Sequence, residues 1–253
     1  ACLGLAALLA LDVGAPLAGW TLLGLACMTK PQAYPLLPLA ALTTLKRFGP
    51  RGLLKGLASG LGAAFLCAIP FIVHGKAGPL WSYFISIAHM HPVVSMNADN
   101  LWWILTWGKG SAVSDLSPAW GLPVSYRTLG LLLLLTLHAP IWRAVWRNPR
   151  GTNLLAWAAV SAAVFFTTAT QMHENYLYLA LPLSAAAMSS EKRLRWAFAA
   201  FSLIFTLNMA LHYPAFTAWL VPDNPDIFTG AELFPARLST ALAATAASLS
   251  LLA

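Results

Sequence analysis

Long apolar stretches, separated by short polar ones, run along almost the whole chain. They do not alternate between apolar and polar positions, as strands of a half-buried sheet or a membrane barrel would, so each is predicted to be a helix. Several contain roughly 15 to 19 residues, close to the length that crosses the apolar part of a membrane. The pattern therefore predicts an all-α, polytopic transmembrane helix bundle with about seven to nine membrane segments, some of them short or kinked. The apolar stretches are residues 1–11, 17–28, 33–45, 56–73, 128–142, 152–170, 175–190, 196–212 and 238–253.

The composition agrees with a membrane protein and argues against a water-soluble enzyme. Of the 253 residues 59% are hydrophobic and only 9% are charged, whereas soluble domains carry about 25% charged residues. The net charge of +7 would suggest nucleic acid as a partner if the basic residues formed one stripe. They stand instead in short clusters between apolar stretches, which is the pattern of cytoplasmic loops. We therefore expect membrane lipid, and no nucleic acid, as a partner.

Three basic clusters predict the orientation of the chain. They contain ten of its fifteen basic residues, and an even number of predicted spans separates each cluster from the next. If all three are cytoplasmic, residues 74–127, 171–174 and 213–237 face outside, together with six of the eight acidic residues. We expect 74–127 to be an external loop region with interfacial helices. The clusters are Lys46, Arg47, Arg51 and Lys55; Arg143, Arg147 and Arg150; and Lys192, Arg193 and Arg195.

Residues 17–45 allow two arrangements, because Lys30 divides them into two stretches that are short for a membrane span. They could form one kinked span with a lysine at mid-depth, or a short helical hairpin with its turn at residues 29–32. We favour the hairpin, because a charge at the centre of a bilayer costs at least ~2.5–3.5 kcal/mol. Since the chain begins and ends inside apolar stretches, we expect residues 1–253 to be a single transmembrane domain of a longer chain.

Three polar islands interrupt the apolar pattern on the predicted outer side: residues 29–32, 89–103 and 170–176. Polar groups at the mouth of a helix bundle are costly unless they line a wet cavity, so the islands are candidate binding sites. A lysine suits a phosphate as a compact charge, while amides and tryptophan faces suit sugar hydroxyls and apolar sugar faces. The candidate substrate-binding residues are Lys30, Gln32, His91, Asn97, Asp99, Asn100, Trp102, His173, Glu174 and Tyr176.

Purely structural roles are possible for each island. Lys30 could be an interfacial lysine that extends to water, and Glu174 could stabilise the first turn of a helix. Asn97, Asp99 and Asn100 could be turn residues that cap a following helix. His89 and His91 do not share a helix face and have no third ligand nearby, so no metal site is expected.

The islands resemble motifs of bacterial multispanning glycosyltransferases of the GT-C superfamily, in particular mannosyltransferase-like members. The chain has Thr-Lys-Pro-Gln, then Ser-Met-Asn-Ala-Asp-Asn-Leu-Trp, then Met-His-Glu-Asn-Tyr-Leu. Those proteins commonly show Lys-Pro-Gln, Ser-Val-Asn-Ala-aromatic-Asn-Leu-Trp and Met-His-Glu-Arg-Tyr-Leu in the same order. The resemblance covers residues 17–190. In this chain Asp99 replaces an aromatic residue and Asn175 replaces a basic one.

The resemblance implies transfer of a hexose from a polyprenyl-phosphate-sugar donor to an acceptor outside the cytoplasm. Lys30 and Gln32 would then lie near the donor phosphate, and Asn97, Asn100 and Trp102 would line the sugar or acceptor pocket. His173 and Glu174 would border the same cavity. The general base of the family is an acidic residue in the first external loop, and no residue of this chain matches it. The lipid-linked sugar is a substrate, and no further cofactor is implied.

The sequence therefore predicts a glycosyltransferase of a bacterial inner membrane that acts at the outer face in building the cell envelope. Its acceptor would be a glycan, a lipid or a protein. The alternative from another class is a transporter or flippase for a lipid-linked or amphipathic substrate. Such proteins carry polar groups at mid-membrane depth and often internal repeats, whereas here polarity gathers on one face. A structural subunit of a membrane complex, in which the islands are incidental, is a third possibility.

Overall fold

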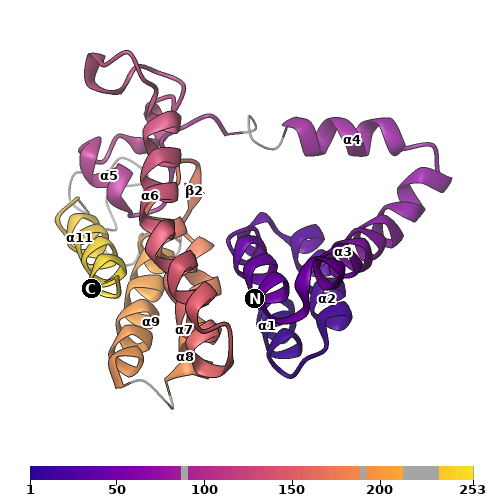
Figure 1. Cartoon of the computed structure of the whole chain (residues 1–253). Coiled ribbons are helices and arrows are strands. Elements are labelled where there is room, and N and C mark those ends of the chain that lie inside the picture. The colour runs from indigo at the N-terminus through magenta and orange to yellow at the C-terminus, as the bar shows by residue number, and fades with distance from the viewer. Residues whose placement is uncertain (87–90, 189–191, 213–233, 253) are drawn as a thin grey trace.

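The computed structural model describes residues 1–86, 91–188, 192–212 and 234–252 (Figure 1). It is 79% helical, which confirms the predicted all-α class. Among the described residues, four helices are long and apolar enough to cross a membrane, and three more apolar helices are shorter. The chain is therefore a helical membrane protein by length and composition, while the number of seven to nine segments stays a prediction.

The described helices and strands occur in the following order along the chain. The sequence is α1 (Cys2–Asp12), α2 (Pro16–Thr29), η1 (Pro31–Ala33), α3 (Leu36–Val73), α4 (Ala77–Ser86), β1 (Ser95–Met96), α5 (Leu101–Leu105), η3 (Gly110–Ala112), η4 (Ala119–Gly121), α6 (Tyr126–Arg147), α7 (Gly151–Thr168), β2 (Met172–His173), η5 (Tyr176–Leu179), α8 (Ala180–Ala187), α9 (Lys192–His212) and α11 (Phe234–Ser250).

Helices α2 and α3 pack against each other on either side of the turn that holds Lys30. Their close approach depends on glycine: a Cβ at Gly24 would lie 2.3 Å from the backbone of Gly60, and one at Gly56 would overlap Trp20. Within α3, Gly49 adopts φ 70° and ψ −176°, which interrupts the helix just before a proline. The proline lacks an N–H and disfavours helical geometry in the residue before it, so the predicted stretches 33–45 and 56–73 meet at a kink.

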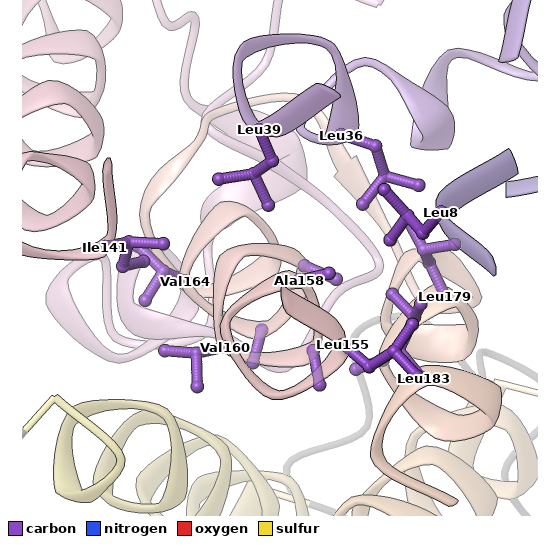
Figure 2. Close-up of a cluster of buried hydrophobic side chains, with 14 of the residues drawn as sticks. Leu8, Leu36, Leu39, Ile141, Leu155, Ala158, Val160, Val164, Leu179 and Leu183 are labelled. Atoms are coloured by element: carbon purple, nitrogen blue, oxygen red, sulfur yellow. The ribbon is translucent and has the colours of Figure 1, made fainter. Parts of the chain in front are cut away.

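Helix α7 lies at the centre of the bundle. In the apolar segment of α7, 67% of the residues are buried, whereas in the most apolar segment of α3 only 17% are buried. In Figure 2, Leu155 of α7 lies near Leu183 of α8, and Val164 of α7 lies near Ile141 of α6. Leu36 and Leu39 of α3 complete this side of the core. Since the side chains of α3 are largely exposed, its apolar surface is suited to lipid contact.

Polar contacts join several elements at one end of the bundle. The guanidinium of Arg47 donates to the carbonyls of Leu11 and Asp12. The carboxylate of Asp12 accepts from the backbone N–H of Gly151, so it satisfies a free donor at the start of α7. The ammonium of Lys46 lies 5.0 Å from the ring centre of Trp146. The first two basic clusters therefore meet at the same end of the molecule.

Candidate functional site

A two-stranded parallel ladder joins the second and third polar islands. Ser95 of β1 pairs with Met172 of β2, and Met96 pairs with His173. Asn97 forms a further bridge with His173 and adopts a positive φ of 63°, a conformation that asparagine tolerates better than most residues. Two segments that are more than seventy residues apart are thus held side by side, as Figure 1 shows for β2 beside the connection that leads into α5.

The first island reaches the third through Asn175. The Lys30 ammonium donates to the Asn175 side-chain oxygen at 3.1 Å and lies 5.4 Å from the ring centre of Tyr176. The Gln32 side-chain amide, nearly fully buried, donates to the Asn175 backbone oxygen at 3.1 Å and its side-chain oxygen at 3.3 Å. These contacts fix the turn after α2 against the turn before η5.

Aromatic and imidazole rings extend this contact. The ring centres of His91 and His173 are 5.6 Å apart, and those of His173 and Tyr176 are 5.3 Å apart. The side chain of Glu174 is 20% exposed, and one of its oxygens lies 3.9 Å from Nδ1 of His173. The structure therefore brings together one ammonium, one carboxylate, two imidazoles, a phenol and two amides. We call Lys30, Gln32, His91, His173, Glu174, Asn175 and Tyr176 the polar cluster.

The polar cluster holds His173 in its neutral form. Burial lowers the pKa of His173 below its ordinary value of 6.5. The nearby carboxylate of Glu174 acts in the opposite direction, while His91 and Lys30 lower the pKa further. Lys30 forms no ion pair within the described part of the chain. A neutral imidazole beside an ammonium that lacks a carboxylate partner is suited to an anionic ligand.

Asn100 and Trp102 lie in the core and support the cluster from behind. The side-chain oxygen of Asn100 accepts from the backbone N–H groups of Trp102 and Trp103, which caps α5. Its amide donates to the Phe166 carbonyl, and the Trp102 indole N–H donates to the Thr168 carbonyl at 2.7 Å. Neither side chain is exposed, so the structure does not place them on an open surface with Lys30. Asn100 therefore has the structural role that the sequence also allowed, because its side chain caps the helix that follows it.

Asp99 is fully buried in an ion-pair network. Its Oδ1 lies 2.9 Å from Nε of Arg237 and 3.4 Å from Nε2 of His212. The backbone N–H of Asp99 donates to the side-chain oxygen of Asn208, whose amide donates to the backbone oxygen of Glu174. Asp99 therefore acts through Asn208 on the backbone of the polar cluster and does not lie beside Lys30.

Asn208 and Asp115 complete this support, and neither is among the residues predicted for the site. Asn208 is an amide inside an otherwise apolar stretch, a signal that could have identified it. Asp115 is a second fully buried carboxylate, bound by Arg127 through two nitrogens at 2.9 and 3.0 Å and by the amide of Gln171 at 2.8 Å. Nothing in the sequence near Asp115 identifies its partners, because they lie 12 and 56 residues away.

Parts of the predicted outer surface lie outside the described residues. These are His89 in the second island and the acidic residues Asp223, Asp226 and Glu232. In the described ranges, no three histidine, cysteine or acidic side chains come close enough to hold a metal ion.

Comparison with known proteins does not assign a function to this site. No protein family model matches the chain, and the comparisons with curated proteins and solved structures find no similar protein. The contacts of the polar cluster are therefore the main indication of function.

Proposed function

We propose that the chain is part of a membrane glycosyltransferase that transfers a hexose from a polyprenyl-phosphate-sugar donor to an acceptor. One observation carries the proposal: Lys30 lies against Asn175 and Tyr176, so the first and third islands, far apart in sequence, share one contact. The β1–β2 ladder adds the second island to the same place. This is the juxtaposition that the resemblance to the GT-C glycosyltransferases requires.

The chemistry of the polar cluster suits the leaving group of such a transfer. The acceptor hydroxyl oxygen forms a bond to the sugar C1, and the bond from C1 to the donor phosphate oxygen breaks. The phosphate leaves with the electron pair, so negative charge grows on it in the transition state. Lys30 would stabilise that charge, with the side-chain NH2 group of Asn175 as a donor beside it, while Gln32 holds Asn175 in place. The hydroxyl proton would pass to the acidic general base that the resemblance implies, which no residue of 1–253 matches.

The proposed location follows from the two ends of the molecule. The first two basic clusters lie at the end of the bundle where Arg47 binds the backbone of Asp12. The polar cluster lies around the turn that begins at Lys30, apart from that end. Under the positive-inside rule the basic end is cytoplasmic and the polar cluster faces outside. We accordingly propose the inner membrane of a bacterium, with a glycan, lipid or protein as the acceptor.

A transporter or flippase for a lipid-linked substrate is the second candidate. It is favoured by the ionisable groups buried inside the bundle, Asp99, His212 and Arg237, because such groups within a membrane protein often mark a translocation path. A flippase moves the lipid-linked sugar unchanged, whereas the glycosyltransferase consumes it.

The full-length protein in vesicles that contain radiolabelled polyprenyl-phosphate hexose distinguishes these functions. We expect label to appear in the acceptor, and Lys30→Ala to lower the rate about 100- to 1000-fold, as loss of one charge-stabilising group does. Lys30→Arg keeps the charge and should retain most of the activity. Lys109→Ala removes an exposed lysine elsewhere and should have no effect.

Two results would overturn the proposal. One is normal transfer by a well-expressed Lys30→Ala variant. The other is movement of intact polyprenyl-phosphate hexose across the vesicle membrane by the wild-type protein, with no labelled acceptor.

A further inference from the structure

A cavity of about 280 Å³ opens between the beginning of α9 and the end of α11, away from the polar cluster. Small side chains from both helices, which we call its floor, line the cavity together with Trp196 and Leu251. The small residues keep the two helices from filling the space between them. The lining residues are Arg193, Trp196, Ala197, Ala200, Ala247, Ser250 and Leu251.

One side of this cavity carries a positive charge. Arg193 lines it, is exposed, and forms no ion pair with the described residues. The four described carboxylates lie elsewhere: Asp12 pairs with Arg47, Asp115 with Arg127 and Asp99 with Arg237, and Glu174 lies beside His173 in the polar cluster. The acidic residue nearest in sequence, Glu191, lies outside the described residues. The charge of the lining side chains therefore favours an anion.

The order of residues along α9 places this charge at the level of lipid headgroups. Trp196 is 80% exposed near the start of a helix that is apolar enough to cross a membrane, a position typical of the interfacial aromatic belt. Arg193 lies about one turn nearer the first residue of α9, about 4.5 Å from Trp196 along the axis, and Ala200 lies about 6 Å beyond Trp196 in the other direction. An elongated ligand in this cavity would contact the Arg193 cation with its polar end and small apolar side chains with the rest of its length.

These features describe a phospholipid more closely than a soluble anion, because a free phosphate would contact Arg193 and leave the apolar floor unused. We propose that the cavity between α9 and α11 binds an anionic phospholipid, with its phosphate against Arg193 and the start of one acyl chain along Ala197, Ala200 and Ala247. The site is independent of the proposed glycosyl transfer.

The test measures the thermal stability of the purified full-length protein in nanodiscs of phosphatidylcholine with increasing amounts of phosphatidylglycerol. We expect the wild-type Tm to rise with the phosphatidylglycerol fraction. Arg193→Gln should weaken apparent binding about fivefold, as expected for one cation near the headgroups. Ala200→Leu, which fills the floor, should also reduce the rise while keeping the charge.

Arg147→Gln is the matched control, because it removes an exposed arginine that does not line the cavity. It should leave the response unchanged. An equal loss in Arg147→Gln and Arg193→Gln would show a general surface-charge effect and would overturn the proposal, as would a full response in Arg193→Gln. Equal stabilisation by inorganic phosphate in detergent would assign the cavity to a free anion instead of a lipid.

Discussion

The buried ion pair between Asp99 and Arg237 gives a sharp test of how the polar cluster is supported. Asp99 is fully buried, Arg237 is nearly so, and their charged atoms are 2.9 Å apart. The pair ties the segment before α5 to the start of α11. Arg237→Gln keeps a polar side chain of similar shape but removes the charge, so the carboxylate loses its closest cation.

The size of the effect follows from this burial. Removing one partner of a buried ion pair costs about 3–5 kcal/mol, because the remaining charge stays buried without compensation. The guanidinium also lies 4.8 Å from the ring centre of Trp103, and because both side chains are buried this contact is worth about 2 kcal/mol. We therefore expect Arg237→Gln to lower the free energy of unfolding by about 3–5 kcal/mol.

A double-mutant cycle in mixed micelles, followed by tryptophan fluorescence as SDS is increased, measures this coupling. Asp99→Asn combined with Arg237→Gln should lose less stability than the sum of the two single changes, by about 1–3 kcal/mol. Arg147→Gln, at an exposed position, sets the background of a simple charge loss. If Arg237→Gln costs no more than Arg147→Gln, or if the two changes are additive, the ion pair does not hold these segments together.

Three further predictions concern the polar cluster and its support. His173 has a lowered pKa, so between that pKa and 6.5 the unfolded chain binds a proton that the folded chain does not. The free energy of unfolding should fall as the pH drops through this window, and His173→Gln should remove that part of the fall in unfolding curves. Asn100→Ala should cost about 1–2 kcal/mol in the same assay, since it removes the cap of α5; no loss would contradict the capping role. Asn175→Arg puts a second cation beside Lys30 and should lower Tm at low salt more than at high salt; a salt-independent Tm would contradict the contact.

Sequence patterns predict the features that are set by residues close together in the chain, such as helices, turns and helix caps. The helical class follows from the spacing and length of the apolar stretches, and the turn that contains Lys30 follows from its prolines. The capping role of Asn100 was one of the alternatives, because an asparagine before an apolar stretch is a common start of a helix. The meeting of two basic clusters at one end agrees with the charge pattern, since Lys46 lies against Trp146.

The partners of the buried charges could not be predicted in this way. Asp99 and Arg237 are 138 residues apart, and Asp99 and Asn208 are 109 apart. No periodicity connects them, and the pairing arises only when α9 and α11 pack against the segment before α5. An aspartate in a polar island looks the same in sequence whether it faces a ligand or an arginine. This is why the pattern of polar islands groups Asp99 with Lys30, although folding places Asp99 behind the cluster.

The contact between Lys30 and Asn175 explains how one departure from the resembled motif fits the fold. The resembled proteins carry a basic residue at the position of Asn175, and a second cation there would repel Lys30. Asparagine instead offers an oxygen, and the Lys30 ammonium donates to it at 3.1 Å. An ammonium has three donors, so this hydrogen bond orients Lys30 and leaves others for an anion. A single cation beside a neutral amide binds an anion less strongly than two cations would. Without a bound anion, however, the site has no repulsion between two cations that would destabilise it. Under the proposed function the site would therefore be preformed with a single fixed charge, and its affinity for a phosphate would depend mainly on Lys30.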